Sequence, residues 1–104
     1  MAGPVWMTFD QFSGRVGQTF EVGAEDGVRI RAELVEATEG AEAGGPGPEG
    51  QSRRQFALVF RGPLEPVLPQ ATHPVEHDEL GRLEIFLVPI GPDGSGMRYE
   101  AVFA

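Results

Sequence analysis

The strongest constraint on the fold comes from residues 82–103, which have the pattern of a β-hairpin. Residues 82–90 form a dense apolar run, and the Gly-Pro-Asp-Gly-Ser-Gly sequence at 91–96 is typical of a tight turn. Apolar and polar residues then alternate over 97–103, as on a strand with one buried face. The end of the chain therefore predicts two paired strands around which the rest of the fold is built.

The two strands of this hairpin differ in how their apolar residues are distributed. The first is apolar on both faces in its middle, which predicts a strand in the interior of a sheet, shielded from solvent: Leu83, Ile85 and Leu87 on one face, Phe86, Val88 and Ile90 on the other. The second alternates cleanly and predicts one face toward water, with Met97, Tyr99, Ala101 and Phe103 opposite Arg98, Glu100 and Val102.

Four further segments have strand patterns: 18–22, 28–37, 54–61 and, as a short edge strand, 72–77. The apolar parity changes near Leu34, which predicts a β-bulge or a strong bend. Near the N-terminus, Thr8 and Gln11 have the spacing of a capping box and predict a single helical turn. The predicted fold class is therefore all-β: a small six-stranded antiparallel barrel or sandwich with one short N-terminal helical turn.

The chain has 104 residues, a length that predicts a single β domain over 1–104. Residues 39–53 are rich in glycine and proline and contain no apolar residue larger than alanine, so they predict a flexible loop. We favour an insertion at a hairpin tip; the alternative is a binding loop that becomes ordered on contact with a partner. Four prolines between positions 63 and 74 predict an irregular connection.

The composition narrows the classes of partner. Because the chain contains no cysteine, disulfides, thiol catalysis and cysteine-bound zinc are all excluded. A net charge of −8, with no lysine, repels nucleic acids and anionic lipid surfaces, so neither is an expected partner. No apolar stretch of about 18 residues and no secretory signal is present. We expect a cytoplasmic protein, or part of an assembly that is exported without a signal peptide.

The nearest approach to a metal site is a group of imidazoles and carboxylates: His73, Glu76, His77, Asp78 and Glu79. On a strand, residues four apart are separated by roughly 13 Å, too far to bind one ion. A helix would bring the two imidazoles together, but Pro74 argues against a helix. We therefore expect two solvent-facing histidines on an edge strand and no bound metal.

The sequence contains no convincing catalytic motif. Ser13, Ser52 and Ser95 occur in glycine-rich turns without the nucleophile elbow of a hydrolase. The glycine-rich segments at 40–50 and 91–96 lack the ending of a phosphate-binding loop. We therefore predict that the protein is not an enzyme and has no catalytic residue and no cofactor.

Four residues are candidates for interaction: Trp6, Arg61, Gln70 and His77. Arg61 ends an apolar strand, where we favour a structural pairing with a carboxylate or loop carbonyls over ligand binding. Gln70 could hold the proline-rich connection through its backbone. Tyr99 is expected to pack in the sheet with its hydroxyl group at the rim.

The order and spacing of several phrases resemble an uncharacterised family of bacterial proteins of similar length, catalogued only as a domain of unknown function. The resemblance covers nearly the whole chain and rests on Phe12, Val16-Gly17, Phe20, Phe56-Ala-Leu-Val-Phe-Arg-Gly-Pro63, Leu68-Pro-Gln70, His77, Leu80-Gly81, Ile85-Phe-Leu-Val-Pro-Ile-Gly91 and Tyr99-Glu-Ala-Val-Phe103. The glycine-rich loop departs from the family in being longer. Members of this family often occur beside phage-tail-like collar or fibre proteins, which implies a role in an assembly.

Two functional hypotheses follow. The first is a non-enzymatic structural or adaptor subunit of a phage-tail-like or cell-surface protein assembly. It would bind a protein partner, or itself, through a strand edge, the segment around Trp6, or the C-terminal strand. The alternative is a small-ligand-binding β-barrel module, with Arg61, Gln70 and His77 near the barrel mouth and residues 39–52 as a lid.

Overall fold

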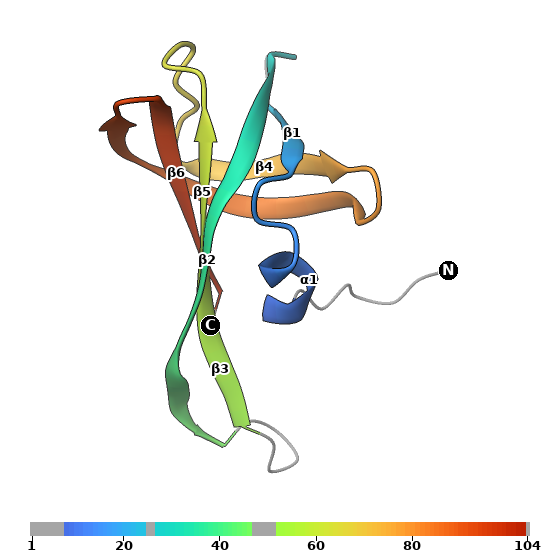
Figure 1. Cartoon of the computed structure of the whole chain (residues 1–104), viewed down its shortest axis with the longest axis vertical. Coiled ribbons are helices and arrows are strands. Elements are labelled where there is room, and N and C mark those ends of the chain that lie inside the picture. The colour runs from blue at the N-terminus through green and yellow to red at the C-terminus, as the bar shows by residue number, and fades with distance from the viewer. Residues whose placement is uncertain (1–7, 25–26, 47–51, 104) are drawn as a thin grey trace.

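The computed structural model describes residues 8–24, 27–46 and 52–103. Within them the chain forms α1 (Phe9–Ser13), β1 (Thr19–Gly23), β2 (Arg29–Pro46), β3 (Ser52–Gly62), β4 (Ala71–His77), β5 (Gly81–Asp93) and β6 (Gly96–Phe103) (Figure 1). Each strand is antiparallel to its neighbours, and the order β1-β2-β3-β6-β5-β4 closes into a barrel. The predicted all-β class, with one short helix, is confirmed.

The hairpin of β5 and β6 forms as predicted, but β5 changes partner along its length. Residues 81–87 pair with β4, whereas residues 88–93 pair with β6. The expectation that both faces of β5 are shielded is wrong, because Phe86 is 49% exposed and Ile90 is 38% exposed. In a barrel made of one sheet, only one face of each strand points into the core.

Closure of the barrel depends on bends and on a small number of cross-strand pairs. A register shift between Leu34 and Glu36 on β2 confirms the predicted bulge. β4 and the first half of β5 cross behind β2, β3 and β6 (Figure 1). The expected edge strand, β4, has two neighbours: it pairs with β5 along its length and with β1 through Glu76 and Val75. The prediction of a free edge at β4 is therefore wrong.

The inward-facing residues of all six strands pack together in the interior. With Phe12 and Leu68 they form one core: Phe12, Phe20, Val22, Ile30, Ala32, Leu34, Phe56, Leu58, Phe60, Leu68, Val75, Leu83, Ile85, Leu87, Tyr99 and Ala101. Burying each large apolar side chain stabilises the fold by about 1.5–3 kcal/mol. Side chains therefore fill the barrel.

Helix α1 closes one end of the barrel. The Thr8 N–H donates to Gln11 Oε1 at 3.0 Å, and the helix ends at Gly14, so the predicted helical turn is confirmed. The fully buried ring of Phe12 packs against Phe20, Phe56 and Phe103. Within residues 8–24, 27–46 and 52–103, no helix is long and apolar enough to cross a membrane.

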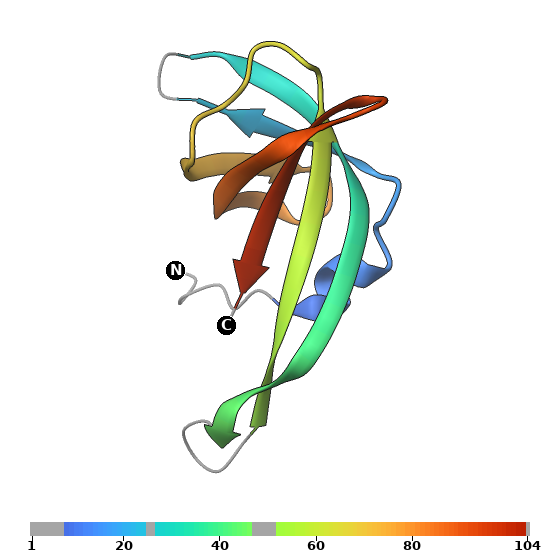
Figure 2. The same cartoon turned by 90° about the vertical axis from the view of Figure 1, so that its left-hand side faces the viewer.

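Strands β2 and β3 continue past the rest of the barrel as a projecting hairpin (Figure 2). Residues 39–46 and 52–53, expected as part of a flexible loop, pair as strands, with Glu42 opposite Arg54 and Pro46 opposite Ser52. The prediction of a loop over residues 39–53 is therefore wrong for these residues. Main-chain pairing that starts in the barrel can continue along strands without large side chains. The rest of that loop, 47–51, lies outside the described residues.

Candidate interaction surface

The outer surface over β1, β4 and the first halves of β2 and β5 is dominated by charged side chains. Cross-strand register aligns Arg31, Glu21, Glu76 and Arg82 in one row. Arg29 Nη1 lies 3.2 Å from Glu21 Oε1 and 3.5 Å from Glu76 Oε1. We call these five residues the paired-charge face, because both of its carboxylates contact a guanidinium.

Two hollows, with volumes of about 160 Å³ and 570 Å³, open on this surface. The larger is lined by Thr19, Glu21, Arg31, Glu76, His77, Asp78, Gly81 and Arg82. Its charged lining consists of three carboxylates and two guanidinium groups, so opposite charges lie close together and partly offset one another.

A second surface lies over β2, β3, β6 and the middle of β5. Here the register aligns Glu36, Val59, Glu100 and Val88 in one row, and Thr38, Ala57 and Val102 in the next. Phe86 lies two residues before Val88 on β5 and faces the same side. We call this surface the apolar–acidic face and define it by Glu36, Val59, Phe86, Val88, Glu100 and Val102.

The apolar–acidic face has two features that differ from an ordinary solvated sheet. Its apolar side chains include Val102, 64% exposed, and Phe86, 49% exposed. Glu36 and Glu100 form no ion pair with the residues that the structure describes, although other carboxylates on the barrel contact an arginine: Glu21, Glu33, Glu76, Glu79, Glu84 and Asp93. Neighbouring exposed apolar side chains beside unpaired charges are typical of a binding surface.

The same region contains an unpaired strand edge. The ladder between β5 and β6 begins at Val88, so residues 81–87 pair only with β4 within the described part of the chain. Residues 101–103 of β6 likewise pair only with β3 among those residues. Alternate N–H and C=O groups of β5 therefore face away from β4 without a strand partner, next to Phe86.

Arg61, one of the predicted interaction residues, is held by carboxylates. Its guanidinium lies 3.3 Å from Asp93 Oδ2 and 3.7 Å from Glu33 Oε1, which confirms the expected structural pairing. Asp93 Oδ1 accepts from the N–H groups of Ser95 and Gly96 at 2.7 Å and 3.0 Å. The hydrogen bond from Ser95 is the main cause that holds the pKa of Asp93 below its usual 3.8, and Arg61 lowers this pKa further.

His77 is buried rather than solvent-facing, because it occupies an inward position of β4. Its Nδ1 accepts from the N–H groups of Glu79 and Leu80 at 3.0 Å and 3.2 Å. Its Nε2 therefore carries the proton and donates to Gln18 Oε1 at 2.7 Å. Both nitrogens are occupied, so His77 holds the turn between β4 and β5 and cannot act as a metal ligand in this arrangement.

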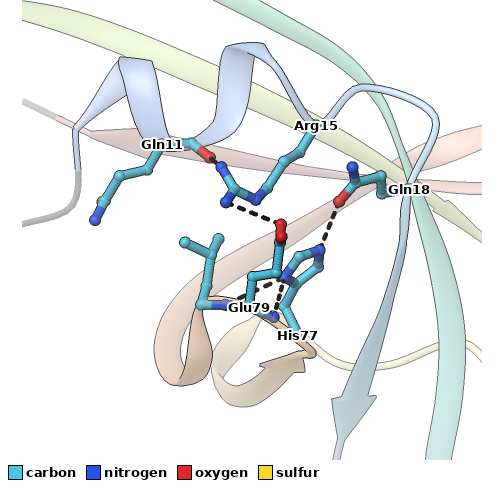
Figure 3. Close-up of polar contacts among 6 residues, drawn as sticks. Gln11, Arg15, Gln18, His77 and Glu79 are labelled. Atoms are coloured by element: carbon cyan, nitrogen blue, oxygen red, sulfur yellow. Dashed lines mark hydrogen bonds and ion pairs between the residues drawn. The ribbon is translucent and has the colours of Figure 1, made fainter.

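Arg15 joins helix α1 to the same turn. Its guanidinium donates to the Gln11 carbonyl oxygen at 2.7 Å and to Glu79 Oε1 at 3.1 Å (Figure 3). The buried Arg15 Nε has no hydrogen-bond partner among the residues that the structure describes. The group around His77 is thus a structural link between α1 and the β4–β5 turn.

His73 is also buried, contrary to prediction. Its Nδ1 lies 3.0 Å from the Gly23 carbonyl oxygen and its Nε2 lies 2.8 Å from that of Pro69. The ring therefore ties β4 to β1 and to the proline-rich connection. Of the residues described, no three His, Cys, Asp or Glu side chains are grouped closely enough to hold a metal ion.

The remaining predicted residues do not form a joint site. Gln70 is exposed and makes no hydrogen bond to any described residue. The connection is held instead by the Leu68 N–H, which donates to the Tyr99 hydroxyl at 2.9 Å, and that hydroxyl is buried rather than at the rim. Trp6 lies outside the described residues. Arg61 and His77 share no partner, so the predicted site at the barrel mouth does not form.

The apolar–acidic face was missed in the sequence, although its signal was present. Phe86 and Val88 share one parity on β5, and Glu100 and Val102 share one parity on β6. Apolar residues on both faces of β5 predict burial on both sides. An exposed binding face produces the same pattern.

Comparisons with known proteins identify a family but no function. A family model described as a domain of unknown function, DUF6916, matches residues 7–103. No curated protein and no solved structure matches the chain.

Proposed function

Because the chain belongs to the DUF6916 family, whose function is unknown, we propose from its own surface that it is a non-enzymatic structural or adaptor subunit of a protein assembly. The subunit binds a protein partner through the apolar–acidic face. The barrel acts as a rigid support for that face, because its interior is filled by side chains.

The observation that carries this proposal is the exposure of Phe86 and Val102 beside Glu36 and Glu100, whose carboxylates form no ion pair with any described residue. Removing apolar surface from water contributes roughly 25 cal/mol per Å². A partner that covers this face gains that term and can also supply cations to the two carboxylates. Without a partner, the apolar side chains stay in contact with water, and the two carboxylates receive no cation from another protein.

We assign the assembly to the phage-tail-like or cell-surface kind. The support is the resemblance of the sequence to a family that often occurs beside phage-tail-like collar or fibre proteins. A small barrel with an exposed strand edge suits such a role, because repeated assemblies are often joined by strand pairing. We rank the alternative of a small-ligand-binding module lower, since Arg61 and His77 each contact other groups of the protein.

The test is a mass measurement of the purified protein alone and mixed with the products of adjacent genes, by size-exclusion chromatography with light scattering. We expect at least one of these products to form a complex of defined stoichiometry. A protein that stays strictly monomeric in every mixture would contradict the adaptor role.

A further inference from the structure

We propose that the partner docks as an extended strand that adds to the free edge of β5 at residues 81–87 and carries arginine or lysine beside an apolar residue on its outward side. This inference rests on the proposed function and deepens it by naming the docking site and the chemistry of the partner. Its evidence is the unpaired edge, the exposed apolar side chains and the unpaired carboxylates.

The first step of the argument concerns the backbone. Residues 81–87 are already extended and held on one side by β4, from Gly81 opposite His77 to Leu87 opposite Ala71. A strand on the other side needs no rearrangement of β5 to form a ladder of main-chain hydrogen bonds. Within the described residues no strand occupies that side, because β6 joins β5 only from Val88 onward.

The second step concerns the side chains of the added strand. On its outward side, they would lie beside Phe86, which is 49% exposed, and near Val102, which is 64% exposed. An apolar residue at this position removes both side chains from water. Because Glu100 already pairs with Val88, the added strand ends next to Phe86, and the first residue of the partner beyond the ladder lies near Glu100, which shares one side of β6 with Val102. A long cationic side chain suits that position.

The third step concerns charge. Glu36 and Glu100 face outward on either side of Val59 and contact no described arginine, whereas the carboxylates of the paired-charge face are neutralised. The whole chain has a net charge of −8. A second copy would bring the same carboxylates to the interface, so like charges would repel. The occupant that matches this field is a cationic segment of a different protein.

The first experiment uses a synthetic peptide, Gly-Ser-Arg-Val-Val-Val-Arg-Ser-Gly, with arginine, valine and arginine on one side of a strand. We expect it to bind the full chain in fluorescence anisotropy, with affinity that falls as salt rises. Two matched peptides should bind at least about tenfold more weakly: one with both arginines replaced by glutamate, and one with the central valine replaced by proline. Equal binding of all three, or no binding at about 1 mM peptide, would overturn the proposal.

Protein variants locate the site. Val102→Ser and Phe86→Ser should each weaken binding at least about tenfold. Leu64→Ser and Val67→Ser remove comparably exposed apolar residues from the connection between β3 and β4 and should leave binding unchanged. Glu36→Gln with Glu100→Gln should weaken binding about fivefold and reduce its salt dependence. Circular dichroism identifies any variant that unfolds, and Val102→Thr then replaces it.

Hydrogen exchange of the wild-type chain provides a readout that needs no substitution. Peptide binding should slow the exchange of alternate amides within residues 81–87, whose N–H groups face away from β4. Protection confined to any other strand would overturn the assignment of the edge. Helical chemical shifts in the bound peptide would overturn the extended form, and a dimer that Val102→Asp dissociates would overturn the choice of a foreign partner.

This design separates the docking site from the adaptor role. If a complex with an adjacent gene product survives Val102→Ser and Phe86→Ser, the docking site is wrong while the adaptor role stands. If the cationic peptide binds as described but no gene product does, the adaptor role is wrong while the edge and its charge preference stand.

Discussion

On the paired-charge face, Arg29 contacts both Glu21 and Glu76, whereas on the apolar–acidic face Glu36 and Glu100 contact no described arginine. Both faces are the outward sides of the same barrel, above the same core. The first resembles a surface adapted to water, with a guanidinium group next to both carboxylates. The second exposes apolar side chains beside the carboxylates of Glu36 and Glu100, so it gains from being covered.

The difference arises from strand pairing rather than composition. Arg29 reaches both carboxylates because closure of the barrel brings Glu21 of β1 beside Glu76 of β4. On the other face, β5 pairs with β6 only from Val88 onward, so Phe86 and Val102 are not paired with each other across the two strands. The strands beneath the paired-charge face are thus paired with their neighbours, whereas β5 and β6 diverge beside the apolar–acidic face.

The largest expected effect tests the core that the two faces share. Leu58 is fully buried on β3, next to Val59 of the apolar–acidic face. Leu58→Ala should lower the free energy of unfolding by about 2–5 kcal/mol, because it leaves a cavity beneath both faces. Val59→Ala, the matched control, should cost less than about 1 kcal/mol. Chemical denaturation measures both, and equal losses would contradict the assigned inward and outward positions.

A smaller effect is expected where β6 is fastened beneath the apolar–acidic face. Tyr99→Phe removes the hydroxyl that accepts from the Leu68 N–H and leaves that donor buried. The free energy of unfolding should fall by about 1–3 kcal/mol. Hydrogen exchange should be accelerated by the substitution more at the Leu68 amide than at the amides of β1. A loss as small as that of an exposed substitution would mean that water satisfies this donor.

The direct comparison of the two faces uses Arg29→Ala and Glu100→Gln. Arg29→Ala separates two carboxylates from their shared cation and should cost up to about 1 kcal/mol at low salt, falling toward zero at high salt. Glu100→Gln removes an unpaired charge and should cost less than about 0.5 kcal/mol at any salt concentration. Thermal unfolding in a salt series distinguishes them. Identical salt responses would remove the distinction between the faces.

The smallest expected effect concerns pH at the turn that ends the apolar–acidic face. The pKa of Asp93 is lower in the folded chain than its usual 3.8, so the ionised form favours folding. This contribution is complete above 3.8 and is lost as the pH falls through the folded-state pKa. Asp93→Asn should therefore flatten the loss of stability between about pH 5 and pH 2, measured as the thermal midpoint. A variant with the wild-type pH profile would contradict this role.

Much of the fold follows from local patterns in the sequence. The parity of Phe56, Leu58 and Phe60 identifies the inward face of β3, and the parity change near Leu34 identifies the bulge. Thr8 and Gln11 identify the start of α1. These features could be predicted because strand alternation and helix capping depend on residues a few positions apart.

The candidate site could not be predicted in the same way. Parity separates Phe86 from Ile85, but only the partner change of β5 shows that Phe86 remains exposed. His73 and His77 were assigned to solvent because β4 was expected at an edge, and closure against β1 buries both.

The sequence by itself determined which residues share a face, where the strands lie, and that the class is all-β. The tertiary structure decided which faces are covered, which carboxylates find a guanidinium, and where β5 leaves its neighbour. The physical reason is that alternation acts within one strand, whereas burial and charge pairing depend on contacts between strands far apart in the chain.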